Sequence, residues 1–255
     1  MSAPSQPLAG LGVVITRPRA AAEALAATLA AAGARPFVFP ALAIEPLPES
    51  RSLGPELDKC DLAIFVSANA VEHGLALVRA QGAWPLRAPV AGIGEATARA
   101  LRNSGFGVVI SPTGRHDSES LLALDELKSV DGRKILIFRG QGGRELLREA
   151  LESRGAHVTY VECYRRTRPA ADAAPLLHAW ALGEIQAVSV LSAETLENFV
   201  AMIGPEGEAH LSQTVLVVPH EAIATRSLAR RFARVVISSL DAGMVPALAS
   251  LRVAS

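Results

Sequence analysis

The chain has 255 residues, half of them hydrophobic, and its 25 basic and 25 acidic residues give a formal net charge of zero. This length allows one large domain or two small ones with a buried core. Balanced charge argues against nucleic acid as the main partner, because nucleic-acid-binding domains usually carry a basic excess. The two cysteines, Cys60 and Cys163, lie outside CxxC and Cys/His metal spacings. This predicts reduced thiols and no metal site.

The first ten residues lack a basic stretch followed by an apolar core, so we predict no signal peptide. No apolar run approaches the roughly 20 residues of a membrane span. We therefore expect a cytoplasmic protein with no membrane partner.

Short apolar runs recur without polar alternation and predict ten buried strands, most of them separated by helix-period segments. Strands that alternate with helices predict parallel sheets covered on both faces. Two sets of five strands fit two flavodoxin-like, three-layer α/β lobes. In chain order the predicted elements are strand 13–16, helix 20–32, strand 36–39, strand 62–66, helix 70–80, strand 90–93, helix 95–103, strand 108–110, helix 118–127, strand 135–138, helix 144–153, strand 158–161, strand 187–191, helix 193–202, strand 215–218, helix 222–232 and strand 235–237.

The sequence of the first half returns in the second half. Arg17 is matched by Arg139, and Ser67 is matched by Ser192 at a slightly larger offset. A period this long indicates domain duplication rather than a solenoid, and ligand sites favour the groove between two such lobes. Proline-rich stretches at 40–48 and 165–175 fall at the same point of the repeat, which predicts paired linkers. Each lobe would then combine segments of both repeats.

Polar residues at predicted strand ends are the candidate ligand contacts, because open α/β sheets bind ligands at the carboxyl ends of their strands. Ser67 and Ser192 precede helices, where a serine cap stabilises by about 1 kcal/mol and the same loop can bind an anion. The glycine-rich 139–143 matches no nucleotide motif and fits a tight turn. The candidates are Arg17, Ser67, Asn69, Gly94, Thr97, Ser118, Arg139, Gly140, Ser192 and His220.

Tyr164 follows Tyr160 by four residues, so strand periodicity places both on one face. Tyr164 packs in the linker or takes part in chemistry; these residues alone leave both open. The arginines that follow it are a solvated run or ligand contacts. His220 has no assignable acidic partner, so a catalytic triad has no support.

An ordered string of short motifs runs through residues 10–240. It consists of VITRP at 14–18, FVSANAV at 65–71, IGEATA at 93–98, DSESLL at 117–122, IFRG at 137–140, GGRELL at 142–147, VECYRR at 161–166, SAETL at 192–196 and VPH at 218–220. The order and spacing of these motifs resemble the uroporphyrinogen-III synthase family.

This resemblance implies a cofactor-independent lyase of haem biosynthesis. Its substrate would be hydroxymethylbilane, an anionic linear tetrapyrrole, which loses water, inverts ring D and closes to uroporphyrinogen III. The implied fold is two flavodoxin-like, three-layer lobes with parallel five-stranded sheets, joined by a two-stranded linker, with the active site in the cleft. Lobe 1 would be 1–39 plus 168–255 and lobe 2 would be 43–163, with linkers 40–42 and 164–167. We expect a monomer.

The resemblance also implies roles for individual residues. Tyr164 matches a tyrosine that assists hydroxyl loss, and Thr97 matches a threonine that lines the cleft. Asn69 stands where some members carry arginine. The remaining matched positions would bind substrate: Arg17, Ser67, Gly94, Ser118, Arg139, Gly140, Ser192 and His220.

Three other functions fit two α/β lobes. A small-molecule binding protein of the periplasm would need a secretion signal. A sugar-nucleotide glycosyltransferase would be longer and less symmetric. A regulatory module built on the synthase fold would not need Tyr164.

Overall fold

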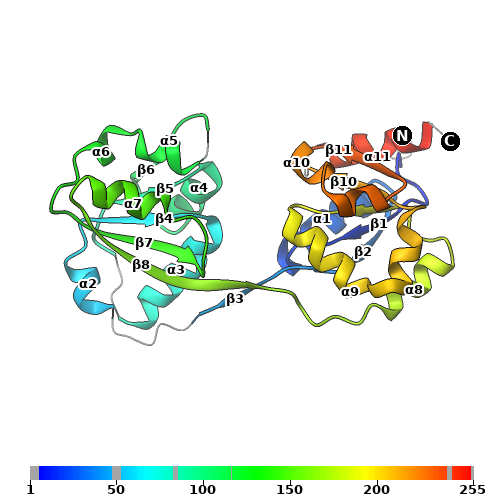
Figure 1. The fold of residues 1–255 in the computed structure, drawn as a ribbon, viewed down its shortest axis with the longest axis horizontal. Helices are drawn as coiled ribbons and strands as arrows, with labels where there is room; N and C mark the ends of the chain where they lie inside the picture. Colours follow the sequence, from blue (N-terminus) through cyan, green and yellow to red (C-terminus); the bar gives the residue numbers. More distant parts are fainter. Residues whose placement is uncertain (1–5, 48–52, 83–85, 116, 240–242, 254–255) are drawn as a thin grey trace, which may run out of the picture. The chain divides into compact units, whose positions relative to one another are not determined.

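The computed structural model describes residues 6–47, 53–82, 86–115, 117–239 and 243–253. The chain folds into two compact units, which are drawn in Figure 1. Unit 1 consists of Met1–Ala43 and Thr167–Ser255, and unit 2 is the continuous segment Ile44–Arg166.

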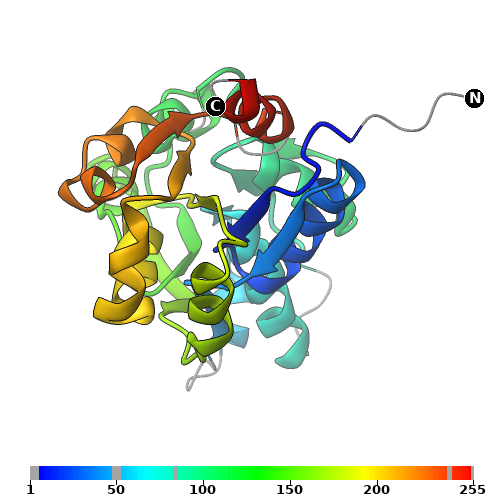
Figure 2. The same ribbon diagram turned by 90° about the vertical axis from the view of Figure 1, so that its right-hand side faces the viewer.

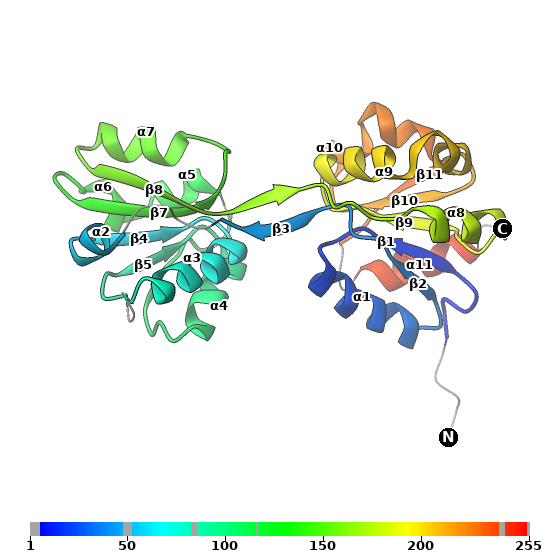
Figure 3. The same ribbon diagram turned by 90° about the horizontal axis from the view of Figure 1, so that it is seen from below.

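Unit 1 is built on a parallel five-stranded sheet with the order β11-β10-β9-β1-β2. α1 and α11 cover one face, and α8, α9, α10 and the 3-10 helix η1 cover the other, so apolar cores lie on both faces (Figures 2 and 3). The strands are β1 (Gly12–Ile15), β2 (Arg35–Val38), β9 (Ala187–Ser189), β10 (Val215–Val218) and β11 (Arg234–Ile237); the helices are α1 (Arg19–Ala31), α8 (Ala174–Ala181), α9 (Ala193–Leu211), α10 (Glu221–Ala224), η1 (Ser227–Arg231) and α11 (Met244–Val253).

Unit 2 is built on a six-stranded sheet with the order β3-β8-β7-β4-β5-β6. α2, α3 and α4 pack on one face, and α5, α6 and α7 pack on the other, as Figure 3 shows. The strands are β3 (Ala43–Pro46), β4 (Leu62–Phe65), β5 (Val90–Gly92), β6 (Val109–Ile110), β7 (Lys134–Gly140) and β8 (His157–Thr167); the helices are α2 (Gly54–Asp58), α3 (Ala68–Ala80), α4 (Glu95–Asn103), α5 (Ser118–Leu122), α6 (Asp125–Lys128) and α7 (Leu146–Ser153).

Each of the two sheets contains strands from both sequence repeats. Unit 1 combines the first two strands of one repeat (β1, β2) with the last three of the other (β9, β10, β11). Unit 2 combines β7 and β8 with β4, β5 and β6. In both units the two-strand piece lies beside the three-strand piece through parallel pairs, β1 with β9 and β7 with β4.

Ten predicted strands are present, but the prediction of five strands in each sheet is wrong for unit 2. β3 forms where the sequence predicts a linker, and it lies beside an extended β8. Leu47 N donates to Cys163 O at 3.0 Å, and Arg165 Nη2 lies 2.8 Å from Glu45 Oε2. The two linker stretches therefore pair as strands, although proline, which is frequent in both, disfavours strands.

Proline and glycine also misled the prediction of helices. α8 begins at the end of the second proline-rich stretch, and Pro175 occupies its first turn, where a missing N–H costs little. α2 and α11 were missed. The predicted helices 118–127 and 222–232 are each split in two, and α9 continues to Leu211 across a kink at Gly204, whose φ is 62°. Gly33, Gly105 and Gly155 follow the ends of helices with φ of 92°, 99° and 84°, a conformation that glycine adopts at little cost.

Close packing between α3 and the sheet positions the start of α3. The rings of Phe65 on β4 and Phe138 on β7 stack with centroids 4.6 Å apart and an interplanar angle of 7°. Gly74 of α3 lies directly on Phe138, because a Cβ at Gly74 would stand 2.7 Å from Phe138 Cδ1. The missing side chain lets α3 approach β7 closely.

Gly74→Ala should therefore destabilise the protein. Alanine is the better helix former by about 1 kcal/mol, but overpacking a filled core costs about 1–3 kcal/mol. Urea unfolding measures the net effect. Combining Gly74→Ala with Phe138→Leu should cost less than the sum of the two single changes. A Gly74→Ala protein as stable as the parent would show that α3 can move outward without penalty.

Candidate functional site

A pocket of about 360 Å³ lies in unit 2, where β7 and β8 pass into the loops that follow them. Its wall combines strand-end residues, the glycine-rich turn after β7 and the first residue of α5. This is the edge of a parallel sheet at which α/β proteins bind ligands. The lining residues are Val66, Ile93, Ser118, Ile137, Arg139, Gly140, Gln141, Gly142, Gly143, Arg144, Leu147, Tyr160, Tyr164 and Arg166.

A β-bulge determines which way Tyr164 points. Arg139 is opposite Glu162, but Gly140 is opposite Tyr164, so Cys163 is an extra residue on β8. Tyr160 packs with the core on the α7 side of the sheet, whereas Tyr164 belongs to the core on the α3 side. The prediction that the two tyrosines share a face is wrong, because the bulge interrupts the alternation on which it relied.

Tyr164 is 2 % exposed and its hydroxyl lies 3.1 Å from Ser67 Oγ. Ser67 caps α3, with its Oγ accepting a hydrogen bond from Ala70 N at 3.0 Å. The His73 ring packs beside the Tyr164 ring, with centroids 5.8 Å apart. Tyr164 is thus fixed between β7 and the N-terminus of α3.

Gly140 leaves the space that the Tyr164 ring fills. A Cβ at Gly140 would stand 2.7 Å from two ring carbons, Cε2 and Cζ, and 3.1 Å from the hydroxyl oxygen. Gln141 N also donates to Tyr164 O at 2.8 Å. The start of the glycine-rich turn therefore contacts both the ring and the backbone of Tyr164.

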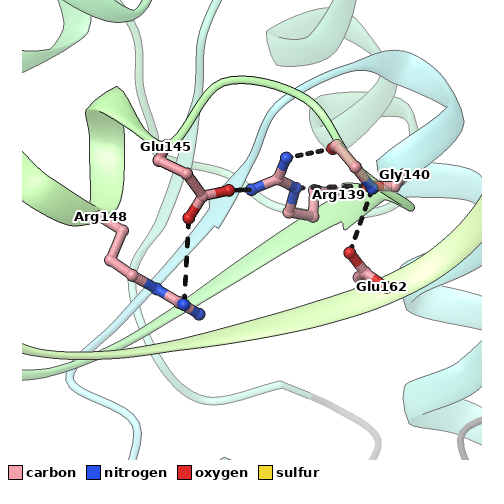
Figure 4. Close-up of polar contacts among 6 residues, drawn as sticks. Arg139, Gly140, Glu145, Arg148 and Glu162 are labelled. Carbon is pink, nitrogen blue, oxygen red and sulfur yellow. Dashed lines mark hydrogen bonds and ion pairs between the residues drawn. The ribbon is translucent and has the colours of Figure 1, made fainter.

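Arg139 binds the glycine-rich turn, as Figure 4 shows. Its side chain is 6 % exposed, and Nη1 lies 3.0 Å from Glu145 Oε1. Nε donates to Gly140 O at 3.3 Å, and Nη2 donates to Gly142 O. Glu162 Oε1 accepts a hydrogen bond from Gly142 N at 3.2 Å.

Ion pairs connect the α5 loop to the pocket rim. Arg144 Nη2 lies 2.5 Å from Glu119 Oε1, and this hydrogen bond lowers the pKa of Glu119. Asp117 caps α5 by accepting from Ser120 N at 2.8 Å, and its bonds to Ser120 lower the pKa of Asp117. Both carboxylates therefore stay ionised near neutral pH, and Ser118 is held at the first turn of α5.

The pocket joins four of the predicted residues of unit 2, namely Ser118, Arg139, Gly140 and Tyr164, and Ser67 reaches it through Tyr164. Thr97 is 5 % exposed in α4 and packs its methyl against Gly92 on β5. The other two predicted residues start helices: Gly94 precedes α4, and Asn69 is the second residue of α3.

The predicted residues of unit 1 lie at the carboxyl ends of its own strands. Arg17 follows β1 and is 8 % exposed, next to Thr16, whose Oγ1 donates to Ser189 O at 2.6 Å. Ser192 caps α9 by accepting from Thr195 N at 3.1 Å. His220 is exposed and precedes α10. The equivalence of Ser67 and Ser192 as helix caps is confirmed.

Sequence reasoning missed several residues that shape the pocket. Tyr160 was considered only for its spacing from Tyr164, Glu145 stood unremarked within the 142–147 motif, and no pattern singled out Arg148. Gln141–Gly143 was interpreted as part of a tight turn, although its position directly after a buried strand was the available signal. In the part of the chain that the structure describes, no group of three or more His, Cys, Asp or Glu could hold a metal ion, and no helix is long and apolar enough to cross a membrane.

The family model described as "Uroporphyrinogen-III synthase HemD" matches residues 23–240 of the chain. The chain belongs to the uroporphyrinogen-III synthase family. The uroporphyrinogen-III synthase of Escherichia coli K12 is 34% identical over 197 residues, which is 76% of this chain and 80% of that protein. The Salmonella typhimurium enzyme is 38% identical over 193 residues, 74% of this chain and 78% of that protein. The Synechococcus elongatus enzyme is 30% identical, with 89% of each chain covered.

Solved structures of uroporphyrinogen-III synthases share the α/β fold. The enzyme from Helicobacter pylori aligns with a TM-score of 0.60 at 12% identity, covering 96% of this chain and 99% of that one. A mutant of the Thermus thermophilus enzyme aligns with a TM-score of 0.57 at 22% identity, covering 96% of both chains. Two mostly parallel sheets are therefore the architecture of this family member.

Gly140→Ala should impair the synthase by displacing Tyr164. The φ of Gly140 lies outside the left-handed region, and the three atoms nearest to the added methyl all belong to Tyr164. We expect the rate of uroporphyrinogen III formation to fall at least about 10-fold, because a displacement of about 1 Å in a substrate-positioning site can lower a rate by about 100-fold. Gly107→Ala is the matched control, since a Cβ there has nothing within 4 Å. Equal rates for both variants would show that the ring moves freely.

Cys163 should be chemically inert although it precedes Tyr164. Burial raises the pKa of its thiol to about 12, and Sγ donates to Arg139 O at 3.4 Å. At a pH below the pKa the thiolate is the minor form. At pH 8, four units below this pKa, only about one thiol in ten thousand is ionised. Iodoacetamide at pH 8 should leave Cys163 of the folded protein unmodified and alkylate it after urea unfolding, as peptide mass spectrometry can show. Rapid labelling of the folded protein would contradict this.

Proposed function

We propose that the chain converts hydroxymethylbilane to uroporphyrinogen III, with loss of water and inversion of ring D. Membership of the synthase family supports the reaction. The observation that carries the site is the contact of Tyr164 with the helix-capping Ser67 at the pocket of unit 2. The enzyme would be a cyclising lyase that needs no cofactor, because the reaction is a dehydration followed by ring closure.

We propose that the two units are flavodoxin-like domains. The strand order of unit 1, read from β2, is 2-1-3-4-5 when its strands are numbered along the chain. This is the flavodoxin order. Unit 2 has the same order if β7 is counted as its first strand, with β3 added outside β8. The boundaries near residues 40–43 and 164–168 would then separate the domains.

Tyr164 acts as the acid that assists loss of the hydroxyl group. Ser67 Oγ accepts from Ala70 N, so its own proton is available to Tyr164 Oη at 3.1 Å. A hydrogen bond in this direction leaves the phenol proton for the departing hydroxyl. It also stabilises the phenolate that remains, since the donor lies at the positive end of α3.

Donors in each unit bind the carboxylates of the substrate. In unit 2 these are Ser118 and Arg166 at the pocket, together with the N-terminal turns that begin near Asn69 and Gly94. Thr97 shapes the wall behind them. In unit 1 they are Arg17, Ser192 and His220. Holding a flexible chain in a reactive conformation supplies much of the acceleration in such a cyclisation.

We further propose that the enzyme works as a cytoplasmic monomer, with the anionic tetrapyrrole as its only partner. The balanced net charge of the chain argues against a nucleic-acid partner.

Tyr164→Phe should lower turnover about 10- to 100-fold, the scale of a positioned acid. The assay supplies freshly generated hydroxymethylbilane and separates type I from type III product. The ring and its packing remain, so the midpoint of urea unfolding should change little.

Ser67 provides the matched pair for this test. Ser67→Thr keeps both the cap and the donor and should retain most activity, whereas Ser67→Ala should lose activity in the same direction as Tyr164→Phe. Only type I product from the parent chain would refute the proposed reaction. Normal turnover in Tyr164→Phe would refute the acid role alone.

A further inference from the structure

Each of the three nitrogen atoms of the Arg139 guanidinium has a partner within unit 2. It pairs with Glu145 at 3.0 Å and donates to the carbonyls of Gly140 and Gly142. These contacts surround a side chain that is 6 % exposed (Figure 4). These contacts use three of the five N–H groups, and the low exposure leaves little of the guanidinium open to a substrate carboxylate.

Two guanidinium groups also contact the Tyr160 ring. Arg139 Cζ lies 4.2 Å from the ring centroid, and Arg148 Cζ lies 3.7 Å from it. Glu145 joins the two arginines, with Oε2 4.0 Å from Arg148 Nη1 (Figure 4). Such cation–π contacts and ion pairs fix the plane of the Arg139 guanidinium.

The two carbonyls that Arg139 holds belong to the turn that supports Tyr164. Gly140 lies against the Tyr164 ring, and Gln141 N donates to Tyr164 O at 2.8 Å. Gly142 is bound on its other side, where its N–H donates to Glu162. A continuous series of contacts therefore runs from Arg139 through Gly140 and Gln141 to Tyr164.

We propose that Arg139 is a positioning residue for Tyr164, acting through the Gly140–Gly142 turn, and that it does not bind a substrate carboxylate. This rests on the acid role proposed for Tyr164. Lysine cannot replace Arg139 in this role, because one ammonium group lacks the planar fork that reaches Glu145 and both carbonyls while lying on a ring. At a simple carboxylate contact, lysine would keep the charge and much of the binding.

The test compares Arg139→Lys, Tyr164→Phe and the double variant in the assay for type III product. We expect Arg139→Lys to lower kcat about 10-fold with KM within about 2-fold, since the loss affects an acid and not binding. In the Tyr164→Phe background the same change should have almost no further effect. Glu145→Gln, at a half-exposed position, should shift kcat in the same direction by a smaller factor.

Arg154→Lys is the matched control for stability. Arg154 Nη1 also holds two backbone carbonyls, Leu122 O at 2.9 Å and Leu127 O at 2.7 Å, but the residue is not part of the pocket wall. It should lower the unfolding midpoint while leaving kcat of the folded enzyme unchanged. This separates the loss of an arginine that holds backbone carbonyls from the loss of Tyr164 positioning.

Two results would overturn the positioning role while Tyr164→Phe still lowers turnover. One is a raised KM with unchanged kcat in Arg139→Lys, which would make Arg139 a substrate contact. The other is a full multiplicative loss in the double variant, which would make the two residues independent. If Tyr164→Phe itself turns over normally, the acid role fails and this proposal fails with it.

Discussion

The register shift between β7 and β8 is the constraint on which the pocket of unit 2 depends. One extra residue, Cys163, moves Tyr164 from the face that Tyr160 occupies to the face covered by α3. There its hydroxyl meets Ser67 at the start of that helix. Without the shift, Tyr164 would point toward the α7 side and the helix cap would have no phenol beside it.

Three small or rigid features keep the shifted strand in place. Gly74 brings α3 close to β7, Gly140 leaves room for the ring, and the Cys163 thiol donates to Arg139 O. Each works by permitting or fixing a close approach and none supplies a reactive group. The position of Tyr164 therefore depends on close packing as well as on hydrogen bonds.

The sequence predicted the parts of the structure that depend on local pattern. Buried strands and the serine caps at Ser67 and Ser192 follow from residue type and spacing. The face of the sheet on which Tyr164 lies was predicted wrongly, because the prediction assumed unbroken alternation along β8. A β-bulge does not change the hydrophobic pattern of a sequence, so the pattern could not reveal it. The role of Arg139 was also hidden, since its partners are set by the path of a loop and by a ring on the adjacent strand. β3 was missed because its pairing comes from β8, more than a hundred residues away.

Along the sequence, unit 2 is one continuous segment between the two parts of unit 1. This order has a consequence for synthesis on the ribosome. β2 ends at Val38, and β1 gains its second neighbour only when β9 begins at Ala187. At about 5–20 residues per second, this interval lasts roughly 7 to 30 seconds. Throughout that time β1, which ends up in the interior of a sheet, has an open edge, and the whole of unit 2 is synthesised before β9 begins. Unit 2 can thus fold first, and the nascent N-terminal strands are the part of the chain most in need of a chaperone.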